Sequence, residues 1–248
     1  MMKQEQIHSK ILGESYAFYR HESGLGILLY PMKGFASAYA LFGTNYGSID
    51  TTFKTQKDAE FVTVPEGIAH FLEHKLFESE EGNALEMFSK TGACANAFTS
   101  FDKTCYLFST TDHFEETLKI LMDCVQNPYF TEENVSKEQG IIGQEIKMYD
   151  DDPSWRVLFN LLTSLYHHNP VRIDIAGTVE SIAKIDKDLL YRCYHTFYNL
   201  NNMVIAIAGN FDLEATARFI EENLKQAEKV EVTSQVPEEP REVVRSLT

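Results

Sequence analysis

Apolar and polar positions near the start of the chain predict a β-hairpin. Residues 25–32 (LGILLYPM) and 35–42 (FASAYALF) are two short, mostly apolar runs, separated by Lys33 and Gly34. Short apolar runs bounded by turn residues are typical of strands, and a two-residue connection suits a tight turn between neighbours. We expect these two strands to pair with each other.

Two later segments also have strand character. Residues 93–111 contain two β-rich runs on either side of the turn-like segment from Ser100 to Asp102, which predicts a second hairpin. Residues 202–209 are mostly apolar, as in a buried strand.

Helical spacing of apolar residues dominates the rest of the chain. Residues 65–79 form the first such segment, with Pro65 at the expected first helical position. Its buried face would consist of Ile68, Phe71, Leu72 and Leu76. Thr131 is a good N-cap, followed by an acidic first turn, for a helix that ends near residue 150. Further helices are expected over residues 82–90, 113–126, 154–167, 186–198 and 212–226.

Two hairpins, long helices and one late strand are typical of an α+β domain. We expect a mainly antiparallel β-sheet with α-helices packed on one face. Residues 1–228 would form this domain. Residues 229–248 are polar and contain prolines, so we interpret them as a linker-like tail that leads towards a second domain outside the chain.

Composition narrows the range of functions. The formal net charge of −15 opposes binding to a polyphosphate, so we expect no nucleic acid partner. No stretch approaches the ~18 apolar residues of a membrane span, the N-terminal segment is polar, and the four cysteines form no C-x-x-C pair. These features favour a cytoplasmic protein with reduced thiols and no membrane partner.

The predicted helix at residues 65–79 contains the candidate metal-binding and catalytic residues. His70 and His74 are four residues apart, so a helix places both imidazoles on one face, where they can bind one metal ion. Glu73 places a carboxylate beside the open coordination position of that ion. This H-x-x-E-H order is the inverse of the commoner H-E-x-x-H motif. The alternative is a chance arrangement on a core helix, but two histidines and a glutamate on a buried helix need a partner to offset their desolvation.

A catalytic zinc ion usually has three protein ligands, so the two histidines need a third. The best candidate is Glu145 on the predicted helix from Thr131 to residue 150, and Glu138 lies seven residues earlier on the same helix face. Spaced glutamates also occur on a solvated helix face, and the pattern alone leaves that alternative open.

Several segments of the chain together carry a family resemblance. They are EGIAHFLEH at 66–74, TGACANAFTSFDKTCY at 91–106, the segment EQGIIGQEI, AGTVESIAKI at 176–185 and the stretch YNLNNMVIAIAGNFD. These segments resemble the inverted-motif zinc peptidases of family M16, which includes pitrilysin, insulin-degrading enzyme and the mitochondrial processing peptidase. The resemblance extends from about residue 24 to 240 and is closest to the bacterial, processing-peptidase-like members.

The resemblance implies roles for particular residues. In the family the third ligand follows the second histidine by some seventy residues, and Glu145 follows His74 by 71. The resemblance therefore implies that Glu145 binds Zn²⁺ and that Glu138 is a carboxylate that supports the metal site. We assign Glu73 and Glu138 as the catalytic residues. The resemblance also implies that a peptide substrate is added as an edge strand along the segment Ala95, Asn96, Ala97 and Phe98.

The resulting hypothesis is a zinc-dependent endopeptidase. Zinc would lower the pKa of a bound water towards ~7, and Glu73 would take the proton and pass it to the leaving amine. Family members enclose their substrate between two such domains, so we expect a homologous C-terminal half or a partner subunit, with a dimer as one form. The alternative is a catalytically silent recognition or scaffold subunit of an M16-type assembly, although such subunits have altered motifs and here every position is intact.

Overall fold

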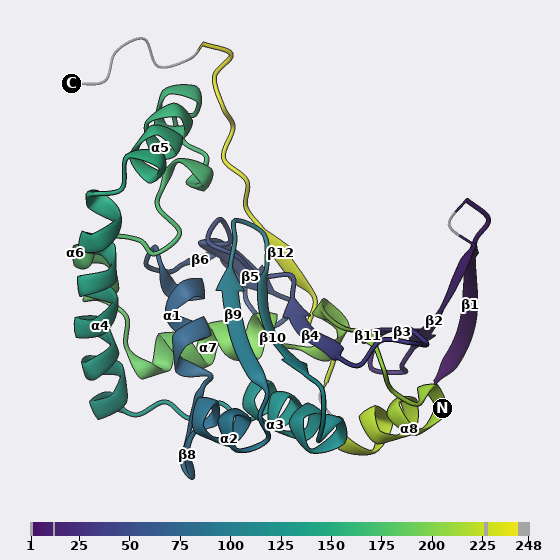
Figure 1. Ribbon diagram of the computed structural model, residues 1–248. Helices are drawn as coiled ribbons and strands as arrows, with labels where there is room; N and C mark the ends of the chain where they lie inside the picture. Colours follow the sequence, from purple (N-terminus) through teal and green to yellow (C-terminus); the bar gives the residue numbers. More distant parts are fainter. Residues whose placement is uncertain (1, 12, 226–227, 243–248) are drawn as a thin grey trace.

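A seven-stranded β-sheet forms the centre of the molecule (Figure 1). The structure is a computed structural model that describes residues 2–11, 13–225 and 228–242. The strand order is β1-β2-β3-β11-β4-β10-β9. Among the described strands of this sheet only β3 and β11 pair in parallel, so the sheet is mainly antiparallel, as predicted. The strands are β1 (Lys3–Ser9), β2 (Glu14–Arg20), β3 (Gly26–Pro31), β4 (Ala38–Thr44), β9 (Cys94–Thr99), β10 (Thr104–Thr110) and β11 (Met203–Gly209).

The predicted pairing of residues 25–32 with 35–42 is wrong. Both segments are strands, β3 and β4, but β11 lies between them, parallel to β3 and antiparallel to β4. The connection from Met32 to Ser37 has to cross two strand spacings, about 10 Å, which its six residues can span. The apolar β11 takes the central position because its backbone is then hydrogen-bonded on both edges while its side chains are largely buried.

The hairpin within residues 93–111 is confirmed, since β9 and β10 pair in antiparallel register. The predicted helices are also present, each within a few residues of its expected bounds. They are α1 (Ile68–Lys75), α2 (Ala84–Lys90), α3 (Phe114–Gln126), α4 (Glu132–Asp150), α5 (Pro153–Leu165), α7 (Lys187–Phe197) and α8 (Leu213–Asn223). Residue 226, the expected end of the last helix, lies outside the described residues.

Thr131 is the N-cap of α4, as predicted. Its hydroxyl accepts a hydrogen bond from the Asn134 amide at 3.1 Å, and the Asn134 side chain accepts one from the Thr131 amide at 2.9 Å. These reciprocal bonds satisfy two amides that the helix itself leaves without partners. The cap therefore fixes where α4 begins, and with it the positions of the glutamates further along.

Pro65 is not the first residue of α1, which begins at Ile68. The N-cap is Gly67, whose φ of 86° lies in the left-handed region. A Cβ at Gly67 would lie 2.3 Å from the carbonyl oxygen of Ala176. The close approach of the 176–177 backbone thus requires glycine at this position and sets the start of the helix.

Several strands and one short helix were not predicted. They are β1 and β2 of the main sheet, β5 (Thr52–Thr55), β6 (Val62–Thr63), β7 (Glu78–Ser79), β8 (Gly82–Asn83), β12 (Val232–Ser234) and α6 (Val179–Ile182). Strand β12 lies within the predicted tail 229–248 and pairs with β5, whereas residues 243–248 of that tail lie outside the described part of the chain.

Helices cover one face of the sheet, as predicted. Burial alternates along the strands, and α1, α2, α3 and α8 contact strands of the sheet while α4 packs against α1. Figure 1 shows α1 between β9 and α4. No helix among the described residues has the length and apolarity needed to cross a membrane. The arrangement places the H-x-x-E-H helix between the sheet edge and the helix that carries Glu138 and Glu145.

The contact at Gly67 generates a test of the fold. We expect Gly67→Ala to lower the free energy of unfolding by about 2 kcal/mol or more, because a left-handed alanine costs roughly 1–2 kcal/mol and the Cβ also meets backbone. Urea unfolding followed by circular dichroism measures the change. Gly140→Ala is the control, since its Cβ would meet nothing within 4 Å and it lies inside α4, where alanine should raise stability by about 0.5–1 kcal/mol. Equal stabilities for the two variants would contradict this account.

Candidate metal centre

Helices α1 and α4 bring three side chains with metal-binding atoms together. His70 and His74 lie one turn apart on α1, and Glu145 faces them from α4. The Nε2 atom of His70 is 3.7 Å from Oε1 of Glu145, and the Nε2 atom of His74 is 3.4 Å from Oε2. One ligand atom from each of the three residues lies within 4.8 Å of the others. The structure therefore brings together the three residues that the sequence proposed as ligands.

These distances fit a zinc ion. Tetrahedral ligands at 2.0–2.1 Å from zinc lie about 3.3–3.4 Å from one another, close to the two separations between imidazole and carboxylate. Burial, and then the neighbouring His74, lower the pKa of His70 to about 3, so this imidazole is neutral near pH 7. A neutral imidazole keeps the lone pair that a metal requires. Two imidazoles and one carboxylate also leave a fourth position for water.

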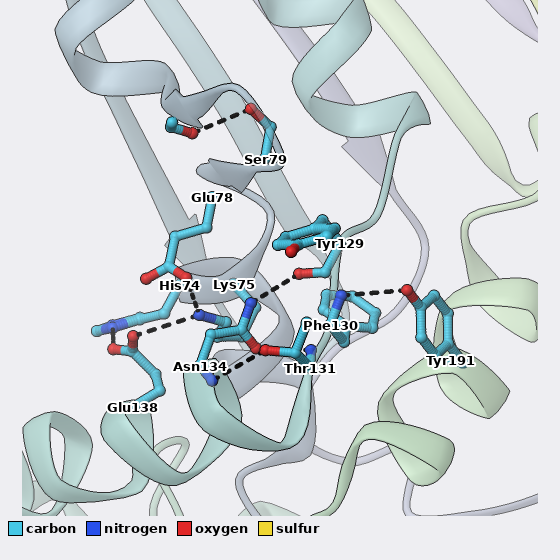
Figure 2. A network of polar contacts seen from close by, with 11 residues as sticks. His74, Lys75, Glu78, Ser79, Tyr129, Phe130, Thr131, Asn134, Glu138 and Tyr191 are labelled. Atoms are coloured by element: carbon cyan, nitrogen blue, oxygen red, sulfur yellow. Dashed lines mark hydrogen bonds and ion pairs between the residues drawn. The ribbon is translucent and has the colours of Figure 1, made fainter.

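Glu138 supports one of these imidazoles from the opposite side. The Nδ1 atom of His74 is 3.0 Å from Oε1 of Glu138, whose side chain is almost fully buried (Figure 2). A carboxylate in this position accepts the Nδ1–H bond and leaves Nε2 free to bind a metal. Burial lowers the pKa of His74, but the hydrogen bond to Glu138 and the surrounding carboxylates outweigh it and raise the pKa overall.

Glu73 lies at the same cavity as the three candidate ligands. The cavity has a volume of about 230 Å³, and Glu73, His70, His74 and Glu145 all line it. The Thr99 hydroxyl donates a hydrogen bond of 2.8 Å to Oε2 of Glu73. Burial raises the pKa of Glu73, while the bond from Thr99 opposes this rise. A carboxylate whose pKa is raised is a stronger base, and this one is held in place beside the metal-binding atoms.

Several residues at the cavity were not predicted from the sequence. Thr99 holds Glu73, and the rings of Tyr149 and Trp155 stack with 4.8 Å between centroids. The indole N–H of Trp155 donates a hydrogen bond to the carboxylate of Asp174. Tyr149, Trp155 and Asp174 line one wall of the cavity. Trp155 is the single tryptophan of the chain, but composition does not place it. Thr99 lies within the segment 91–106 that carries the family resemblance, but nothing in the sequence singles it out from its neighbours, and the three wall residues lie outside every quoted segment.

The predicted substrate segment lies along the outer strand of the sheet. β9 pairs with β10 on one side and is the last strand in the order on the other. Ala97 and Phe98 line the cavity, and the Phe98 side chain is 41% exposed. Ala95 and Asn96 are in the same strand but are not part of the cavity lining. An open strand edge therefore runs directly to the metal-binding cavity.

Comparison with known proteins agrees with this geometry. The profile of "Insulinase (Peptidase family M16)" matches residues 64–179, and that of the "Peptidase M16 inactive domain" matches residues 184–248. The chain belongs to peptidase family M16. Zinc is accordingly the cofactor, because members of the family are zinc proteases and the cluster of His70, His74 and Glu145 can bind a metal ion.

Proteins similar to this M16 chain, and solved structures similar to it, support the same family assignment. An uncharacterised zinc protease of Bacillus subtilis (strain 168), YmfH, is 55% identical over 212 residues, which cover 86% of the chain and 50% of YmfH. The structure of an M16-like peptidase from Alicyclobacillus acidocaldarius is 42% identical with a TM-score of 0.88, covering 99% of the chain and 55% of that protein. Pitrilysin, at 18% identity and a TM-score of 0.73, shares the fold over 90% of the chain and 24% of its own length. The chain thus spans about half the length of the curated relatives it matches.

The ligand cluster predicts a loss of zinc on substitution. We expect Glu145→Ala to weaken zinc binding by more than the about 10–100-fold typical of losing a supporting residue, because it removes one of three protein ligands. Zinc retained after dialysis against a chelator, measured by atomic emission, tests this. Glu133→Ala, at an exposed position in the first turn of the same helix, is the control. Wild-type zinc content in Glu145→Ala would exclude this carboxylate as a ligand.

Proposed function

We propose that the chain is the catalytic half of a zinc-dependent endopeptidase that hydrolyses peptide bonds in small peptides or unfolded segments. The observation that carries the proposal is the position of Glu73, which shares one cavity with His70, His74 and Glu145. A zinc ion bound by those three residues would polarise the scissile carbonyl and activate water. The cavity thus contains a base beside a metal site, next to an open strand edge.

Glu73 is the general base of the proposed reaction. Its carboxylate accepts a proton from the attacking water and then delivers that proton to the nitrogen of the leaving amine. Thr99 keeps one carboxylate oxygen in place through its hydrogen bond. Glu138 does not contact the substrate, and we assign it the positioning of His74.

The substrate would bind as an additional strand along β9. The amide of Ala97 is bonded to the Asn96 side chain of the same strand at 2.8 Å, so this N–H is available to a peptide that displaces the amide oxygen. Main-chain pairing of this kind gives affinity without strict sequence preference, which suits a broad peptide substrate. Residues 95–98 are therefore the proposed substrate-binding segment.

The rest of the active enzyme would come from a second half. The chain covers about half of YmfH and of the Alicyclobacillus peptidase, which supports a homologous C-terminal half or partner subunit facing this cavity, in one chain or as a dimer. We propose residues 1–228 as the catalytic domain and 229–248 as the path towards that half. A silent scaffold role is not favoured, because the metal site and Glu73 are complete. The cytoplasmic location stays a prediction.

The base can be tested separately from the metal. Glu73→Gln should retain zinc but reduce kcat by about 10²–10⁴-fold, because the amide cannot accept the proton. Cleavage of a quenched fluorescent peptide and zinc content are measured in parallel, with the chain alone and mixed with its presumed C-terminal half. Glu86→Gln, an exposed position on α2, is the control. If Glu73→Gln cleaved at the wild-type rate, Glu73 would not be the base.

The strand edge is tested by removing one amide donor. Ala97→Pro should raise KM about tenfold with a smaller effect on kcat, because the N–H that would bind the peptide is lost and the ring blocks the edge. Asn96→Ala is the matched control, since it removes the competing side chain and keeps the donor. An unchanged KM in Ala97→Pro would argue against pairing at this position.

A further inference from the structure

Lys75 is a fully buried lysine next to the metal centre, and the mechanism above gives it no role. It directly follows His74 at the end of α1, and its side chain is 0% exposed. A buried ammonium carries a large desolvation cost unless carboxylates surround it. An uncharged residue such as methionine would fill the same space without this cost. The presence of a buried positive charge at this position therefore requires a structural or functional explanation.

Two carboxylates lie near the ammonium group. The Nζ atom is 2.5 Å from Oε2 of Glu78 and 3.9 Å from Oε2 of Glu138. Figure 2 shows the ammonium between them, with His74 on the far side of Glu138. The other oxygen of Glu138, Oε1, is the one that accepts the hydrogen bond from Nδ1 of His74. The buried Glu138 carboxylate thus has a cation at one oxygen and a metal-ligand imidazole at the other.

We propose that Lys75 is a positioning residue of the metal centre, whose buried ammonium fixes the Glu138 carboxylate so that it orients the His74 ring. Lys75 supplies the positive charge that offsets the burial of Glu138, and its attraction for Oε2 turns Oε1 towards Nδ1 of His74. Glu78, which is partly exposed, contacts the same ammonium from the outer side. The inference rests on the proposed role of His74 as a zinc ligand.

A purely structural role makes a different prediction. A lysine at a helix C-terminus also interacts favourably with the helix dipole, and the contact with Glu78 ties α1 to strand β7. If that were its only function, replacing Lys75 would change the stability of the metal-free protein but not its affinity for zinc. Zinc affinity in folded variants therefore distinguishes the two roles.

The test is a measurement of zinc affinity by competition with a chromogenic chelator, on the wild-type chain and on variants. Lys75→Met should weaken zinc binding by about 10–100-fold, the range typical of a residue that orients a ligand. Glu78→Gln should stay within about threefold of wild type, because the ammonium still faces Glu138. Wild-type affinity in Lys75→Met, or an equal loss in Glu78→Gln, would overturn the proposal.

A double-mutant cycle tests the connection through Glu138. Once Glu138→Gln has removed the carboxylate, Lys75→Met should cause less than about threefold further loss of zinc affinity, because the charge has nothing left to orient. Losses that multiply would show that Lys75 acts independently of Glu138 and would overturn the proposal.

Two further measurements keep the outcome interpretable. Thermal unfolding of each metal-free variant reports whether it folds. If Lys75→Met does not, the variant with both Lys75→Met and Glu78→Gln removes the unpaired Glu78 charge, and its zinc affinity should show the same about 10–100-fold loss. Wild-type affinity in that variant would overturn the proposal. Failure of the wild-type chain to bind zinc would instead overturn the metal centre itself, and the inference with it.

Discussion

The packing of α1 against α4 is the constraint on which the site depends. A zinc ion requires its ligands within about 3.3–3.4 Å of one another, so an error of 1 Å in the separation of the two helices would disrupt the cluster of His70, His74 and Glu145. Three features fix that separation. Gly67 lets α1 start directly against the backbone at Ala176, the cap at Thr131 sets the start of α4, and Glu138 bonds to His74 across the interface.

Electrostatic balance is the second requirement of this interface. Glu73, Glu138 and Glu145 lie around His74, and three carboxylates in one partly buried region repel one another. Zinc would offset part of this charge, and the Lys75 ammonium contributes next to Glu138. The fold can therefore hold the carboxylates close together before any metal binds, which is the condition for a preorganised site.

The sequence predicted most helices and the pair of histidines, because both depend on local spacing, whereas the resemblance to the family was needed to choose Glu145, which lies 71 residues after His74. The interval of four between His70 and His74 is a property of one helix, and capping at Thr131 is local as well. Strand pairing is not local: β11 begins at Met203, 159 residues after β4 ends at Thr44, yet it separates β3 from β4. Thr99 and Lys75 could not be assigned for the same reason, since their roles follow from contacts with residues on other segments.

Metal binding and substrate binding have different requirements in this chain. All three candidate ligands, their supporting carboxylate and the base lie between residues 70 and 145, within one packed unit. The proposed peptide site is different, because the outer edge of β9 has no partner strand among the described residues. An extended peptide paired along one edge gains modest free energy from each hydrogen bond and keeps its other side in solvent. A second surface would be needed to close that side, so we expect zinc affinity to depend on this chain's own residues and tight peptide binding to depend on that additional surface.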